Sequence, residues 1–162
     1  MTEIDFASYD LTQPKHRYRI LSKIPPDRAA VRMLHTELRD LFRREMKYRK
    51  SGSPALPNDE YDYADMSYWC GLLLYLIGDP ADTPLMWEAK NIDFDLGCAF
   101  DIQFMVGAGV DQTIRYLESH GTNDAVEYLE SCRRARDFED LRGWERFRIH
   151  YFYPNITSPE DA

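Results

Sequence analysis

The sequence predicts an all-α protein, either a compact multi-helix bundle or a short HEAT-like stack of helices with an extended aromatic C-terminal arm. Apolar residues recur at helical spacing in several windows, and residues suited to helix capping precede those windows. The loops between the windows are brief. The chain has 162 residues, of which 44% are hydrophobic, so we expect one domain spanning 1–162 with a sizeable core.

The N-terminal segment, residues 1–25, is expected to be irregular because prolines punctuate it. Within it, the stretch 16–20 is expected to form a short extended piece. The longest helix is then expected from Asp27 to about Lys50, and the Ser-Gly-Ser-Pro sequence at 51–54 should end it. The face opposite its apolar stripe is heavily basic. The residues of the stripe are Val31, Leu34, Leu38, Leu41, Met46 and Tyr48.

A second long helix is expected from Glu60 to Ile77. Acidic residues crowd its first turns, where the helix dipole favours negative charge. Its second half, from Ser67 onward, is apolar and should be buried. Gly78 is placed to end this helix as a C-cap.

The stretch from Asp79 to Leu117 is expected to organise the fold as three short helices. Thr83 is placed to cap the first helix, and Asp93 or Asp95 to cap the second. The body of the second, from Leu96 to Val106, is apolar almost all round, as expected for a helix that others surround. A tight corner containing two glycines then separates it from the third helix.

The C-terminal part of the chain mixes two patterns. After a helix that begins at Asn123, the spacing of Phe138, Leu141 and Trp144 is helical. Beyond Trp144 the residues Phe147, Ile149, Tyr151 and Tyr153 alternate with Arg148 and His150, as they would in a strand. We therefore expect an extended aromatic arm laid over the core, followed by a loose tail over 154–162.

Composition bounds the class of function. The net charge of −8 argues against general nucleic-acid binding, because phosphates favour a basic surface. The longest apolar run, 68–77, is about half of what a membrane span requires. The first residues lack the basic start and apolar run of a signal peptide, so we expect a cytoplasmic protein. Cys70, Cys98 and Cys132 are expected to be buried thiols in a reducing compartment.

Charge is divided unevenly along the chain. From Lys15 to Lys50 there are twelve basic and four acidic residues, a charge of +8, whereas Ser51 to Asp101 carries ten acids and one lysine, a charge of −9. Either the two segments pack together and their charges cancel, or the acidic positions present a surface that attracts a basic partner. Both explanations stay open.

Carboxylates are the candidates for chemistry. Asp93, Asp95 and Asp101 could bind a divalent cation, so a metal-dependent hydrolase that uses them is an alternative function. Helix capping accounts for Asp93 and Asp95 without a metal. No histidine has a second histidine four residues away, and no nucleophile motif occurs. We therefore expect a protein that is not an enzyme and has no cofactor.

Three pieces between Asp82 and Val110 carry a family resemblance: D-T-P-L-M-W-E-A-K, D-F-D and D-I-Q-F-M-V-G-A-G-V. This stretch resembles small helical immunity proteins, which are encoded beside bacterial polymorphic toxins, and it covers about a fifth of the chain. The resemblance implies a non-enzymatic inhibitor that binds one cognate toxin domain and masks its active site. An acidic surface suits that role when the toxin has a basic surface.

The function expected from the sequence is therefore binding and neutralisation of a cognate toxin, without nucleic-acid or membrane partners. A homo-oligomeric scaffold, in which the basic helix of one chain meets the acidic segment of the next, is a further alternative, and a homodimer is left open. Acidic residues would guide recognition, and tyrosines would anchor the contact. The residues predicted to contact the partner are Asp59, Glu60, Tyr61, Asp62, Tyr63, Asp65, Asp79 and Asp82.

Overall fold

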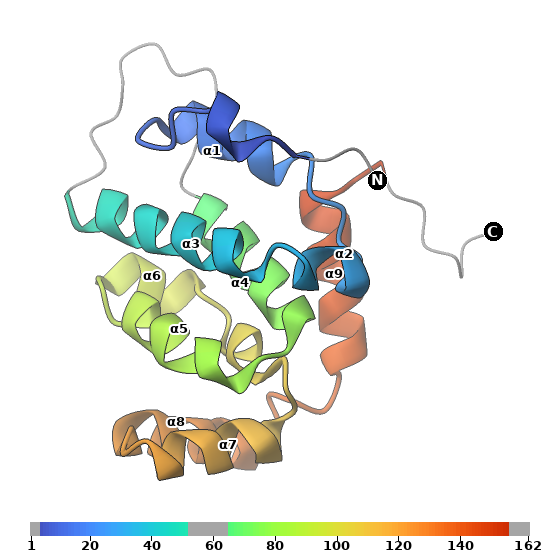
Figure 1. Cartoon of the computed structure of the whole chain (residues 1–162). Coiled ribbons are helices and arrows are strands. Elements are labelled where there is room, and N and C mark those ends of the chain that lie inside the picture. The colour runs from blue at the N-terminus through green and yellow to red at the C-terminus, as the bar shows by residue number, and fades with distance from the viewer. Residues whose placement is uncertain (1–3, 52–64, 156–162) are drawn as a thin grey trace.

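The computed structural model describes residues 4–51 and 65–155. Within these ranges the regular structure is helical throughout, which confirms the all-α prediction and the compact bundle (Figure 1). No helix in the described ranges combines the length and the apolar character needed to cross a membrane.

Helix α4 (Met66–Ile77) lies at the centre of the fold (Figure 1). All twelve of its residues are buried, as predicted for the second half of that helix. It is apolar on every side because other elements surround it. The elements packed against it are α1 (Pro14–Leu21), α2 (Arg28–Arg32), α3 (His35–Lys50), the 3-10 helix η4 (Ile102–Val106) and α9 (Leu141–Phe152).

The remaining helices form a second group on one side of the centre. In Figure 1, α5 lies between α3 and the pair formed by α7 and α8. Helices α7 and α8 pack against each other, and α5 contacts α6, α7 and η4. A short 3-10 helix precedes α1 at the start of the chain. The bounds are η1 (Phe6–Ser8), η3 (Pro80–Asp82), α5 (Thr83–Lys90), α6 (Phe94–Ala99), α7 (Val110–Ser119) and α8 (Asn123–Arg134).

Two glycines allow the backbone after α4 to approach the corner after η4. Gly78 ends α4 in the left-handed conformation, with φ 72°, as predicted for a C-cap. A Cβ atom on Gly78 would lie 2.9 Å from the carbonyl oxygen of Gly107, and one on Gly107 would lie 2.2 Å from the carbonyl oxygen of Tyr75. The tight corner predicted at Gly107 is therefore confirmed, and it depends on the missing side chains.

The single helix predicted over 27–50 is wrong, because the chain turns at Met33 and Leu34 and divides it into α2 and α3. Asp27 caps α2, since its Oδ1 accepts a hydrogen bond of 2.9 Å from Ala30 N. Met33 is 76% exposed at the turn. The turn lets two helices of different direction both pack on α4.

The irregular segment predicted over 1–25 is wrong for Pro14–Leu21, which form the helix α1, and the extended piece predicted over 16–20 is wrong because it lies within that helix. Pro14 stands in its first turn, where a missing N–H costs nothing. Arg17 is buried on the inner face and pairs with Glu45 of α3. A charged residue at a core position obscured the helical pattern.

The helix predicted from Leu96 to Val106 is divided at Phe100, which has extended backbone angles and separates α6 from η4. The Phe100 side chain is completely buried, with its ring centroid 6.0 Å from that of Phe42 and 5.0 Å from that of Phe104. Packing of this ring in the core outweighs continuation of the helix. The central helix is therefore α4 rather than this stretch.

The extended aromatic C-terminal arm is wrong, because α9 continues as one helix from Leu141 to Phe152. Asp140 caps it by accepting a hydrogen bond of 2.9 Å from Gly143 N. Phe147 and Tyr151 lie four residues apart on its exposed side, so their spacing fits a helix as well as a strand. The tail predicted over 154–162 lies mostly outside the described residues.

The cysteines differ from one another. Cys70 and Cys132 are buried thiols, as predicted, whereas Cys98 is exposed on α6. None of the three forms a disulfide. The prediction of burial is therefore wrong for Cys98, because α6 is a short helix at the surface whose Leu96 alone is buried.

Candidate functional site

The eight residues predicted to contact a partner have different surroundings. The five residues 59–63 lie outside the described ranges, so their role stays a prediction. Asp65 precedes α4, and its carboxylate accepts a hydrogen bond from the hydroxyl of Tyr151 on α9. Asp79 caps η3 by accepting a hydrogen bond of 2.9 Å from Ala81 N. Asp82 is only 1% exposed, so its carboxylate is not presented at the surface.

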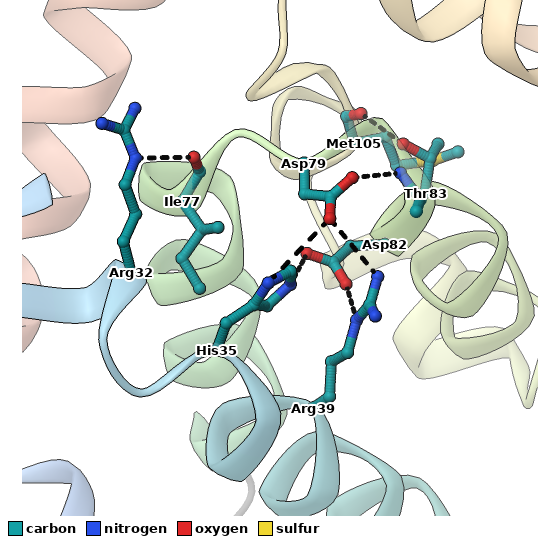
Figure 2. Close-up of polar contacts among 9 residues, drawn as sticks. Arg32, His35, Arg39, Ile77, Asp79, Asp82, Thr83 and Met105 are labelled. Carbon is teal, nitrogen blue, oxygen red and sulfur yellow. Dashed lines mark hydrogen bonds and ion pairs between the residues drawn. The ribbon is translucent and has the colours of Figure 1, made fainter.

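Asp82 belongs to a polar cluster formed by His35, Arg39, Asp79 and Asp82 (Figure 2). His35 Nε2 lies 2.8 Å from Asp82 Oδ2, and Arg39 Nε donates a hydrogen bond to Asp82 Oδ1. Arg39 Nη2 lies 3.7 Å from Asp79 Oδ2. Figure 2 shows the side chains of α3 reaching the chain segment between α4 and α5.

The polar cluster contains a donor set that suits a divalent cation. One ligand atom each from His35, Asp79 and Asp82 lies within 4.8 Å of the others. Arg39 already places a positive charge against both carboxylates, and Asp79 is also used in capping. The geometry therefore fits an ion-pair network that fastens α3 to the start of α5.

The structure does not bring together the alternative metal ligands. Asp93 caps α6 by accepting a hydrogen bond of 2.8 Å from Leu96 N, which confirms capping at this position. Asp101 accepts a hydrogen bond of 2.7 Å from Trp144 Nε1 and pairs with Arg148 at 2.5 Å. Asp95 is exposed in the first turn of α6. In the described part of the chain these three aspartates do not form a metal-ligand group.

The basic and acidic segments neutralise each other in part. Arg39 pairs with Asp82, and Lys50 Nζ lies 2.7 Å from Glu88 Oε1, so both pairs join α3 to the acidic segment. Asp93 and Asp95, by contrast, are exposed on α6. Mutual neutralisation therefore accounts for the charges of Asp82 and Glu88, whereas Asp93 and Asp95 remain exposed as an acidic surface would require.

An open groove with a volume of about 550 Å³ runs along α5. Four of its lining residues share one face of α5 at positions i, i+3, i+4 and i+7. They are Pro84, Trp87, Glu88 and Asn91, the last being the C-cap of the helix. Lys50 contributes from the end of α3, and Asp124 from the first turn of α8. We call this feature the α5 groove. Its lining residues are Lys50, Pro84, Trp87, Glu88, Asn91, Ile92 and Asp124.

Aromatic side chains are exposed in and beside the α5 groove. The rings of Trp87 and Tyr128 have centroids 5.5 Å apart, and Tyr128 is 41% exposed. Phe94, which follows the groove residue Ile92 by two positions, is 82% exposed and stands between two exposed aspartates. Exposed apolar side chains rimmed by polar residues are typical of a surface that another molecule covers.

Lys90 holds the segment beneath this surface in place. It is buried, and its ammonium group donates hydrogen bonds of 2.7 Å to Gly97 O and 2.8 Å to Phe100 O. Burial lowers the pKa of this lysine. The contacts tie the end of α5 to the end of α6, so Phe94 projects from a fixed support.

Sequence reasoning missed the α5 groove, although one signal for it was present. The spacing of Pro84, Trp87, Glu88 and Asn91 places them on one helical face, and they lie within the stretch 82–110 that resembles immunity proteins. Their apposition to Asp124 depends on tertiary packing, which spacing cannot predict. Comparisons of the chain with family models, with curated proteins and with solved structures find no match.

Proposed function

We propose that this chain is an immunity-type protein, which binds a cognate bacterial toxin domain and masks its active site. The observation that carries the proposal is the α5 groove, with exposed aromatic rings beside exposed carboxylates. The stretch 82–110, which resembles immunity proteins, contains both α5, which carries Trp87, and α6, which carries Phe94. The contact surface proposed here is therefore centred on α5, α6 and the start of α8.

The aromatic residues would supply most of the binding energy. Tryptophan and tyrosine are enriched among the interface residues that cost most when truncated. Burying a phenylalanine that is 82% exposed, as Phe94 is, would contribute about 2 kcal/mol to binding. Trp87 and Tyr128, whose rings contact each other, would add a second anchor.

The carboxylates would act mainly on the rate of association. Glu88, Asp93, Asp95 and Asp124 are exposed, and opposite charge on a toxin would steer the encounter. Salt screens interactions between exposed charges, so the association rate should fall as ionic strength rises. The dissociation rate should change less.

The test is binding to the product of the gene that neighbours this one. Co-expression with that product should restore growth, and the two proteins should co-purify as a stoichiometric complex. Association and dissociation rates are then measured by biolayer interferometry at several salt concentrations. Absence of a complex at micromolar concentration in low salt would contradict the proposal.

Variants locate the surface within that experiment. Replacing Phe94 and Tyr128 together by alanine should weaken the complex by at least about tenfold, because Phe94 is lost and the second anchor keeps only Trp87. Phe147→Ala is the matched control, since Phe147 is 60% exposed on α9, away from the groove. Reversal of Asp59 and Asp62 to lysine tests the acidic residues predicted first, and an unchanged association rate would remove them from the contact.

A further inference from the structure

We infer that the α5 groove receives a basic side chain of the partner, an arginine or a lysine, and that Lys50 of this chain occupies part of that site before binding. The inference rests on the proposed function and adds the chemistry of the contact to it. Lys50 and Glu88 both line the groove, and their charged groups lie 2.7 Å apart.

The lining of the groove matches the two parts of a long basic side chain. Pro84, Trp87 and Ile92 offer apolar surface for the aliphatic stem. Glu88 from α5 and Asp124 from α8 offer carboxylates for the charged end. The indole of Trp87 also attracts a cation placed over its face.

Asn91 adds a polar group suited to the same ligand. Its amide nitrogen donates a hydrogen bond of 2.7 Å to the carbonyl oxygen of Trp87. Its carbonyl oxygen remains an acceptor for the N–H groups of a guanidinium. The groove volume of about 550 Å³ lies within the range of about 300–1,000 Å³ typical of ligand pockets, so a complete side chain fits.

The pair formed by Lys50 and Glu88 is exchangeable, unlike the polar cluster. Its side chains are 52% and 53% exposed, and exposed ion pairs are weak. Arg39 instead pairs with a carboxylate that is 1% exposed, and that pair also fastens two helices. A partner's cation can therefore take the place of Lys50 without disturbing the fold.

The test is calorimetric titration of the full chain with a blocked hexa-arginine peptide, with hexa-glutamate as the peptide control. Hexa-arginine should bind and hexa-glutamate should not. The double variant Glu88→Gln, Asp124→Asn should weaken hexa-arginine binding by about tenfold, because two carboxylates are lost. Lys50→Gln should strengthen it by about threefold, because the competing cation is removed.

Glu139→Gln is the matched control variant. Glu139 is 63% exposed and pairs with Arg136 at 3.0 Å, so it resembles Glu88 in exposure and partner but lies outside the groove. This variant should leave hexa-arginine affinity unchanged. The stability of each variant is checked by urea unfolding, so that loss of folding is not mistaken for loss of binding.

The effect of Lys50→Gln shows whether Lys50 competes with the partner's basic side chain for Glu88 or forms only an ordinary surface ion pair with it. Unchanged or weaker peptide binding by this variant would overturn the inference. A toxin complex whose affinity does not change with Trp87→Leu would also overturn the inference and remove Trp87 as an anchor, while the binding of a toxin by this chain would stand. Peptide binding with the expected variant pattern, but no complex with the neighbouring gene product, would contradict the proposed function alone.

Discussion

Helices α4 and α9 have the same length, twelve residues, and opposite surroundings. Every residue of α4 is buried, whereas α9 contributes none to the buried core. Apolar packing on all sides fixes α4, while α9 is held at its partly buried face by directed contacts. The comparison teaches that helices of one bundle can owe their position to different forces, and that substitutions should affect them differently.

The largest effect is expected next to α4, from the buried ion pair of Arg17 and Glu45. Both side chains are 2% exposed. Arg17→Met should lower the free energy of unfolding by about 3–5 kcal/mol, because an uncompensated carboxylate would remain inside. The measurement is urea unfolding at neutral pH.

The pH dependence of Arg17→Met provides its control. Burial raises the pKa of Glu45, although Arg17 opposes that shift. Because the pKa of Glu45 is higher in the folded state, the stability that this group contributes is fully present below its unfolded pKa of about 4.3. That contribution is lost as the pH rises through the pKa of Glu45 in the folded protein. The loss in free energy of unfolding caused by Arg17→Met should therefore be smaller near pH 4 than at neutral pH. A loss that does not change with pH would contradict this account.

A smaller loss is expected from an apolar truncation within α4. Leu73 is completely buried, so Leu73→Ala should lower the free energy of unfolding by about 2–5 kcal/mol through lost packing and a residual cavity. Phe147→Ala on α9 is the contrast, because Phe147 is 60% exposed and should change stability by less than about 0.5 kcal/mol. Equal losses in urea unfolding would remove the distinction between the two helices.

A still smaller effect is expected at the contact that fastens α9. Asp101→Ala removes the acceptor of Trp144 Nε1 and the partner of Arg148, and should cost about 1.5–3 kcal/mol. Amide hydrogen exchange should accelerate in α9 and remain slow in α4. Equal acceleration in both helices would show that α9 is not held separately.

The smallest effect is expected at alkaline pH, where Tyr75 of α4 faces α9. Its ring centroid lies 4.9 Å from that of Trp144, and burial with the nearby Glu145 raises its pKa to about 12. The stability it contributes is full below the unfolded pKa of about 10 and is lost as pH rises through about 12. Tyr75→Phe should flatten this part of the stability profile, measured by urea unfolding between these values.

The sequence alone was sufficient to predict the buried helix α4, but it was insufficient to predict that α9 is a helix. A continuous apolar run followed by Gly78 identifies a buried helix and its end without knowledge of neighbours. Along α9 and its C-cap, the residues Phe147, Ile149, Tyr151 and Tyr153 satisfy a period of two, and Phe147 and Tyr151 also satisfy a helical period. Contacts with the distant Asp101 support the helix, and they cannot be read from local spacing.

The same limit applies to the sites. Asp82 has the appearance of a surface acid in the sequence, but its carboxylate is buried against His35 and Arg39, which are 47 and 43 residues away, and Arg39 supplies the opposite charge. Helical spacing predicts that Trp87 and Glu88 share one face of α5. It cannot predict that this face lies beside Asp124 of α8, because that depends on tertiary packing. Long-range pairing of charges decides which carboxylates remain exposed.

The approach of Gly78 to Gly107 has a consequence for how this chain tolerates mutation. Two backbones touch there with nothing between them, and the Cβ atoms that substitution would add point at carbonyl groups rather than at movable side chains. Relaxation of neighbouring rotamers therefore cannot relieve the overlap. In a library randomised at both codons and selected for foldability, glycine should be recovered at each, independently of the residue at the other.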